Sequence, residues 1–207
     1  PVFIALVLSS GAALGEDVST VIAGVESTYG KVSSLEASFV QISRSPSMGE
    51  TKQKGKLILE RPRKMRWSFT RPPGKLFVTD GATMWIWSKA DNQVIISSAA
   101  PGAGGGDMTQ LLDSLDKLSE LFEVELLAGT SKSFQLKLTP RKQGNVQSIE
   151  LMVSRKGYSV EQIKTLDGFG NELDLSFHGV KTNTKVASSS FSFDVPEGAQ
   201  VIRTDGP

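Results

Sequence analysis

The chain has 207 residues, of which 39% are hydrophobic and 22% are charged, and its formal net charge is +1. These values are ordinary for a globular protein, and the length fits one domain with a substantial core. The sequence has no Cys, which excludes a disulfide framework, a zinc–thiolate site, an iron–sulfur cluster and a thiol nucleophile. A Ser–His–Asp triad would have to use the single His, His178. The composition therefore favours a protein that works by binding over an enzyme.

Residues 1–15, PVFIALVLSSGAALG, carry no charge and combine an apolar stretch with small residues. Ala13 and Gly15 suit the −3 and −1 positions of a signal-peptidase site before Glu16. We interpret this segment as a signal peptide truncated at its N-terminus, followed by one domain over residues 16–207. A buried first strand or helix is the alternative. A transmembrane anchor is disfavoured, because the stretch is too short to span ~30 Å of hydrocarbon. No Cys near the cleavage site could carry a lipid anchor, so we expect a soluble exported protein.

An amphipathic helix is expected over Asp17–Lys31, because apolar residues recur there at helical spacing and Asp17 or Ser19 can cap it. The period then changes to two, which is typical of strands, and turn-forming residues separate the runs. The roughly ten-residue spacing favours an antiparallel meander. The expected strands are Leu35–Ile42, Lys54–Glu60, Lys64–Thr70, Lys75–Thr79, Thr83–Trp87 and Gln93–Ser97.

A Gly-rich loop, Pro101–Asp107, interrupts the strands. It lacks the Lys-Ser/Thr pair of a phosphate-binding loop, so a flexible hinge is the better interpretation. Met108–Phe122 follows and predicts one broken helix or two short ones. About eleven or twelve strands are expected in total, with the second group at Glu123–Leu127, Ser133–Thr139, Ser148–Ser154, Val160–Leu166, Glu172–Val180 and Ser190–Phe193.

Alternation along the strands indicates a sheet with one apolar and one charged face. The apolar parity holds Leu57, Leu59, Met65, Trp67 and Phe69, and Arg61 shares it at a strand end. The two helical segments can cover this face. So little helix over so many strands can leave a cavity for a hydrophobic ligand, and a fully packed barrel core is the alternative. In the strand Lys75–Thr79 the same alternation assigns Leu76 and Val78 to the apolar face.

We find no catalytic or metal constellation. GxSxG and HExxH motifs are absent, and His178 lies in an expected strand, where a surface or packed His is the ordinary role. DGFGN at Asp167–Asn171 reads as a hairpin turn. The prediction is a protein that is not an enzyme and has no cofactor or metal, and a small hydrolase using Ser and His178 is the alternative.

Charge is uneven along the chain. The segment Arg44–Lys75 contains ten Lys and Arg residues against two Glu, whereas the rest of the chain is acidic. Such a segment forms a solvated face, or a docking surface for an acidic protein or anionic headgroups. We expect no nucleic-acid partner, because no nucleic-acid motif accompanies the charge.

The ordered segments of the chain resemble the periplasmic outer-membrane lipoprotein carrier family, LolA. The first half contributes KGKLILERPRKMRW (Lys54–Trp67) and LFVTDGATMWIW (Leu76–Trp87). The second half contributes FEVELLAG, FQLKLTPR, GYSVEQIKTLDGFGNE and FSFDVPEGAQVIR. The resemblance covers Glu16–Arg203, and the ordered set is more specific than any one piece.

The resemblance implies an incomplete antiparallel β-barrel of about eleven strands, covered by a helical lid and enclosing an apolar cavity. It implies a monomeric periplasmic chaperone that takes lipoproteins by their acyl chains from an inner-membrane ABC exporter. The carrier then delivers them to an outer-membrane acceptor. A periplasmic sensor of lipoproteins, or a carrier of another lipid, is the alternative within the same fold.

The resemblance also implies a site. The family's functional Arg, in an Arg-Pro step, matches Arg61, and it bonds to lid backbone and holds the empty form closed. Apolar positions after it match Met65 and Trp67. A further cavity position matches Phe77, against the alternation noted above. The full set of expected ligand-binding residues is Leu57, Leu59, Arg61, Met65, Trp67, Phe69, Phe77, Met108, Leu111, Leu112 and Leu115.

Overall fold

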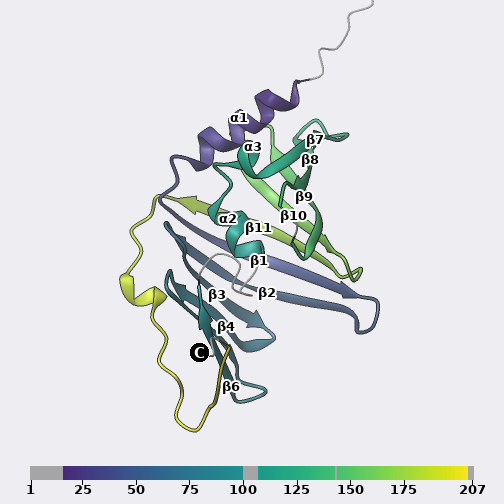
Figure 1. Ribbon diagram of the computed structural model, residues 1–207. Helices are drawn as coiled ribbons and strands as arrows, with labels where there is room; N and C mark the ends of the chain where they lie inside the picture. The colour runs from purple at the N-terminus through teal and green to yellow at the C-terminus, as the bar shows by residue number, and fades with distance from the viewer. Residues whose placement is uncertain (1–15, 100–106, 143, 205–207) are drawn as a thin grey trace, which may run out of the picture.

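The computed structural model describes residues 16–99, 107–142 and 144–204 (Figure 1). The expected signal peptide over residues 1–15 and most of the expected Gly-rich hinge lie outside the described residues. The helices are α1 (Val18–Tyr29), α2 (Asp107–Asp113), α3 (Leu118–Leu121) and a short 3-10 helix, η1 (Ser188–Phe191). The strands of the first half are β1 (Ser34–Ser45), β2 (Gly49–Glu60), β3 (Lys64–Arg71), β4 (Pro73–Asp80), β5 (Thr83–Ser88) and β6 (Gln93–Ser98). Those of the second half are β7 (Phe122–Leu126), β8 (Ser133–Pro140), β9 (Val146–Ser154), β10 (Val160–Asp167), β11 (Glu172–Thr182) and β12 (Gln200–Arg203).

Twelve strands form one sheet in the order β12-β6-β5-β4-β3-β2-β1-β11-β10-β9-β8-β7. Each half of the chain is a meander, and the two halves meet where β1 pairs with β11, with Phe39 opposite Phe177. The sheet is strongly curved but does not close, because β12 and β7 remain at its edges within the described part of the chain. The expected incomplete barrel of mainly antiparallel strands is confirmed.

Helix α1 starts where the sequence allows it to be capped. The Asp17 side chain accepts a hydrogen bond from the Ser19 backbone N–H at 3.4 Å, which satisfies one of the free donors of the first turn. The Ser19 hydroxyl also donates to the Asp17 carboxylate, and the two hydrogen bonds lower the Asp17 pKa, with the hydroxyl contributing more. The broken helix expected over Met108–Phe122 is two short helices, α2 and α3.

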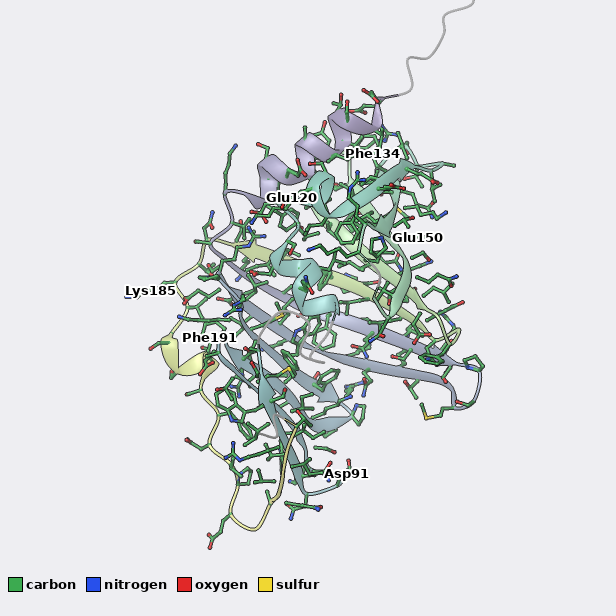
Figure 2. All side chains as sticks on the ribbon, viewed as in Figure 1. Asp91, Glu120, Phe134, Glu150, Lys185 and Phe191 are labelled. Carbon is green, nitrogen blue, oxygen red and sulfur yellow. The ribbon has the colours of Figure 1, made fainter. Side chains whose placement is uncertain are left out.

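The C-terminal segment differs from the prediction. Ser190–Phe193 was expected as a strand, but η1 occupies this place, and the Ser190 N–H bonds to the Ala187 carbonyl within it. The alternating Phe191 and Phe193 mimic a strand, although Phe191 is buried for another reason: η1 packs against β3 and β4. Phe191 is labelled in Figure 2. The prediction also missed β12, which is short and mostly exposed and pairs with β6 in parallel.

Helices α1, α2 and α3 cover one face of the sheet, which we call the inner face. α1 buries Val21, Val25 and Tyr29 in the main core, and α2 lies in front of the middle of the sheet (Figure 1). The main core joins these residues to apolar side chains of β1–β3 and β8–β11. The three helices α1, α2 and α3 are called the lid below.

Candidate lid latch and apolar cavity

The apolar face predicted from alternation lies under the lid. Leu57 and Leu59 of β2 are opposite Trp67 and Met65 of β3, and all four are buried. Phe39 of β1 adds an edge-to-face contact with the Trp67 ring at 4.9 Å between centroids. Aromatic and Met side chains of this kind supply large, adaptable apolar area.

Phe69 and Phe77 extend this face beyond the buried centre, where both are half-buried against the main core. Phe77 is opposite Trp67 in the β3–β4 register, so the two side chains share the inner face. The alternation that assigned Leu76 and Val78 to that face is therefore wrong. Val78 is buried on the other, outer face, where η1 covers β3 and β4.

The lid contributes leucines from α2 and the turn after it. Leu111, Leu112 and Leu115 are each buried in the main core. Met108 falls within α2, but its side chain lies outside the described residues. α3 adds two leucines that were not among the expected site residues: Leu118 is fully buried, and Leu121 is partly buried against the main core.

A small apolar cavity separates the lid from the sheet. Its volume is about 20 Å³, which is enough for roughly one water molecule. Five expected site residues line it: Leu57, Leu59, Arg61, Leu112 and Leu115. The other lining residues come from α1, β1, β10 and β11 and the adjoining chain: Tyr29, Val32, Leu35, Val160, Phe177 and Val180. The sequence carried a signal for two of these residues: Leu35 shares its strand parity with Phe39, and Tyr29 falls at the helical spacing of the first helix.

Arg61 connects the sheet to the lid at one end of this cavity. Its side chain is only 16% exposed, and its Nη1 donates to the Tyr29 carbonyl, the last of α1, at 3.0 Å. The same nitrogen lies 3.3 Å from Asp116 Oδ1, and Nε lies 3.9 Å from Asp113 Oδ1. A charge at this depth needs such partners. We call Arg61, Tyr29, Asp113 and Asp116 the latch.

The latch is incompletely satisfied. Arg61 Nε and Nη2 and Asp116 Oδ1 are buried without a hydrogen-bond partner among the described residues. The carboxylates of Asp113 and Asp116 therefore compensate the buried charge of Arg61 mainly through their short distance from it, and few hydrogen bonds fix this geometry. Such an arrangement stabilises the closed lid less than a fully bonded network does, because each unbonded polar atom carries a desolvation cost.

Tyr29, the last residue of α1, is hydrogen-bonded at both its carbonyl and its side-chain hydroxyl. Its carbonyl accepts from Arg61, and its buried hydroxyl accepts from the Val160 N–H at 2.9 Å. Burial raises the pKa of the Tyr29 hydroxyl above its ordinary value of 10.0, and the Val160 N–H and the Arg61 charge oppose that rise. The end of α1 is thus tied to the sheet at β10 and at the end of β2.

Other chemistry is not apparent in the described part of the chain. No group of three or more His, Asp or Glu side chains is placed to hold a metal ion there. His178 is exposed on β11. The loop at Asp167–Asn171 is the expected hairpin turn, with the Asp167 carboxylate accepting from the Phe169 and Asn171 N–H groups. No described helix is long and apolar enough to cross a membrane.

Fold and site together define an open half-barrel whose apolar inner face is closed by a helical lid. The sequence matches the family model described as outer membrane lipoprotein carrier protein LolA over residues 30–194. The chain therefore belongs to the LolA family.

Relatives and solved structures agree with that placement. The chain is 28% identical to the outer-membrane lipoprotein carrier protein of Methylibium petroleiphilum, over 96% of this chain and 95% of the relative. It is 28% identical to the protein of the same name from Legionella pneumophila strain Lens, over 86% and 88% of the two chains. An uncharacterized conserved protein from Thermus thermophilus shares the fold with a TM-score of 0.55 and 18% identity, over 89% and 98%.

Proposed function

We propose that this protein binds the acyl chains of lipoproteins on the apolar inner face and carries them across the periplasm to the outer membrane. The observation that carries the proposal is a large apolar sheet face covered by a lid that one side chain, Arg61, fastens. Family membership supports the same role, because the relatives are named for it.

The acyl chains of the cargo determine how much hydrophobic free energy the carrier must supply. A lipoprotein presents about three acyl chains, and at ~0.8 kcal/mol per methylene some 45 methylenes in water cost roughly 35 kcal/mol. A carrier must offset most of this cost. The closed cavity of about 20 Å³ cannot hold even one chain, so cargo has to enter by displacing the lid from Leu57, Leu59 and Trp67.

The latch explains how the carrier can release its cargo. Opening the lid breaks the contacts of Arg61 with Tyr29 and Asp116, and closing without cargo restores them. The closed, empty form therefore competes with the loaded form and limits the affinity for cargo. The sequence contains no ATP-binding motif, so loading energy comes from a partner, which we infer to be an inner-membrane ABC exporter, and an outer-membrane acceptor receives the cargo.

Binding of a triacylated lipopeptide tests the proposal directly. The purified protein should co-elute with the lipopeptide in gel filtration and should not co-elute with the same peptide without acyl chains. Leu59→Gln, on the inner face, should abolish co-elution. Ile58→Gln, one residue away on the outer face, is the matched control and should keep it, and thermal unfolding checks that both variants fold.

A depletion strain tests the cellular role. Loss of the protein should leave outer-membrane lipoproteins in the inner membrane, because the acyl chains cannot cross the periplasm unaided. Lipoproteins that reach the outer membrane at the normal rate without this protein would overturn the carrier role. Lipopeptide binding together with normal sorting would instead indicate the sensing alternative.

A further inference from the structure

Helix α1 is fastened unequally to the two halves of the sheet. Within the described part of the chain, Arg61 is the only residue of β1–β6 and their turns that hydrogen-bonds to α1. The strands β8–β10 and the turn between β9 and β10 instead hold the helix near its start, its middle and its end. In Figure 1, α1 and α3 lie beside β7 and β8, away from β3–β6.

Two residues of the β9–β10 turn, Arg155 and Tyr158, hold the start of α1. Arg155 Nη1 donates to the Glu16 carboxylate at 3.2 Å, and the Tyr158 hydroxyl donates to the same carboxylate at 3.3 Å. An ion pair as exposed as this one contributes little by itself. The guanidinium is fixed further, because Arg155 Nε donates to the Thr130 carbonyl at 2.9 Å and lies 4.0 Å from the centre of the Phe134 ring.

The Tyr158 ring also supports the middle of α1. A Cβ on Gly24 would come within 2.6 Å of this ring, so the helix backbone rests directly on it. The ring is stacked in turn on Phe134, with 6.1 Å between centroids and 6° between planes. Tyr158 has a φ of 53°, which is rare for a bulky side chain and persists only where the surroundings hold it. We call Arg155, Tyr158 and Phe134, which is labelled in Figure 2, the helix seat.

The end of α1 is bonded to the same turn and to the strand after it. The Thr28 hydroxyl donates to the Gly157 carbonyl at 3.0 Å. The Val160 N–H donates to the Tyr29 hydroxyl at 2.9 Å. Helix α1 is therefore bonded to the segment from Arg155 to Val160 at both of its ends.

Helix α3 is joined to the same side of the sheet. The Glu26 carboxylate of α1 accepts from both the N–H and the hydroxyl of Ser119, each at 2.7 Å. The Leu121 carbonyl of α3 accepts from the Arg141 N–H, directly after β8, at 3.0 Å. α3 also packs against β7. The two helices and the strands β7–β10 thus form one bonded unit.

The contacts of the lid with β2 and β3 are of a different kind. Besides Arg61, the Arg63 N–H donates to the Asp113 carboxylate at 3.4 Å, and the main core supplies apolar packing against Leu57 and Leu59. Acyl chains can replace apolar contacts at little cost, because hydrocarbon takes the place of hydrocarbon. Lifting α1 from the helix seat would instead leave polar groups without partners, which is costly.

An apolar row continues from these residues across the first half of the sheet. Trp67 is opposite Phe77, Phe77 is opposite Ile86, and Ile86 is opposite Ile95. The last three are half-buried on the inner face, and the row contains no charged residue. Four strands at a spacing of about 4.8 Å make this row roughly 14 Å long. It offers acyl chains a continuous surface beyond the lid.

We propose that α1 and α3 stay on β7–β10 when the lid opens, and that acyl chains enter between the lid and β2–β3 and extend over β3–β6. Arg155 and Tyr158 are then positioning residues, because they hold the part of the lid that does not move. The entry route rests on the proposed carrier function. The seating of α1 can be tested without any cargo.

Thiol labelling tests the helix seat, because the chain has no Cys of its own. Leu57→Cys reports on β2, and Val153→Cys reports on β9, where Val153 pairs with Phe134 and Val160; both side chains are at most 1% exposed. A maleimide should label the thiol at position 57 faster than the one at position 153. Arg61→Leu should raise the rate at position 57 by about tenfold and leave the other rate unchanged. Equal rates at the two sites, or an equal rise at both, would overturn the proposal.

Cross-linking tests the entry route with the triacylated lipopeptide. A short bis-maleimide that joins Glu16→Cys to Arg155→Cys fixes α1 on its seat, and the linked protein should co-elute with the lipopeptide as the unlinked form does. The same linker between Arg63→Cys and Asp113→Cys fixes the lid to the β2–β3 turn. It should reduce co-elution by about tenfold or more, because the closed form cannot take cargo.

Each unlinked variant is the control for its linked form, and thermal unfolding checks that all of them fold. The opposite pattern, or an equal effect of the two links, would overturn the proposal. If the parent and the unlinked variants do not bind the lipopeptide at all, the carrier function fails. The labelling rates then still decide whether α1 stays on its seat.

Discussion

The guanidinium of Arg61 donates to the backbone carbonyl of Tyr29 at 3.0 Å, so the end of β2 holds the last residue of α1. Carboxylates of the lid, Asp113 and Asp116, lie on the same guanidinium. One side chain therefore contacts two parts of the lid that are far apart in the sequence. Their positions depend on each other through Arg61.

Replacing Arg61 with Leu should loosen the lid without unfolding the sheet. Hydrogen bonds to charged groups contribute about 1.5–3 kcal/mol, so amide exchange in α1 and α2 should accelerate by about tenfold or more. Cargo should also be trapped, because the closed form no longer competes with the loaded form. Hydrogen-exchange mass spectrometry and the release rate of a fluorescent lipid measure the two effects.

Arg203→Leu, at an exposed site on β12, is the control and should change neither measurement. Asp116→Asn should reproduce part of the Arg61→Leu effect and make lid opening less sensitive to salt, because it removes one charge of the pair. If Arg61→Leu releases lipid as fast as the parent and exchanges no faster, the latch does not control opening.

Trp67 should report cargo by its fluorescence. It is buried on the inner face, whereas Trp85 and Trp87 are two residues apart on β5, and their register partners are Val78 and Leu76 of the outer face. In a variant with Phe at both other positions, lipopeptide binding should shift the Trp67 emission. The complementary variant, which keeps those two and carries Trp67→Phe, should show no shift. An unchanged Trp67 spectrum at saturating lipopeptide would place the cargo elsewhere.

Gly24 should be intolerant of Ala although it lies inside a helix. A Cβ at this position would come within 2.6 Å of the Tyr158 ring. Gly→Ala in an exposed helix ordinarily stabilises by about 1 kcal/mol, but here we expect a loss of about 1–3 kcal/mol from overpacking. Ser27→Ala, at an exposed site of the same helix, should stabilise instead. Denaturant unfolding measures both, and a stabilised Gly24→Ala would show that α1 can shift without cost.

Stability should fall in alkaline solution through Tyr29. Burial raises its folded pKa above 10.0, so the folded protein holds this proton more tightly than the unfolded chain does. The contribution is complete below pH of about 10 and is lost as the pH rises through the raised pKa. The unfolding free energy of the parent should therefore decline above pH 10 more steeply than that of Tyr29→Phe. Equal slopes in the parent and in Tyr29→Phe would contradict the assignment.

Alternation was enough to predict most strands, because each strand buries one face and exposes the other. It failed at Leu76 and Val78, since η1 buries part of the outer face and both faces of β4 are then apolar. No local pattern could reveal this, because η1 arrives from the far end of the chain. The same reason explains the missed β12, whose pairing with β6 depends on the path of that segment.

Some residues of the candidate site could be predicted from the sequence and others could not. The apolar residues of β2 and β3 were visible in the sequence, and Arg61 came from the family resemblance. Asp113 and Asp116 were not predicted, because only the turn between α2 and α3 brings these carboxylates to the guanidinium. The roles of these residues in cargo binding remain predictions for the experiments above.

The seam between β1 and β11 has a consequence for how the chain folds. Phe39 and Phe177 face each other across it, although they lie near opposite ends of the sequence. Closing so long a loop costs chain entropy before any contact repays it, and such distant pairing slows folding. The N-terminal meander can assemble early, but β1 keeps an unpaired edge until β11 is available. While the chain is being synthesised, that edge is the place where a binding factor would protect it from self-association.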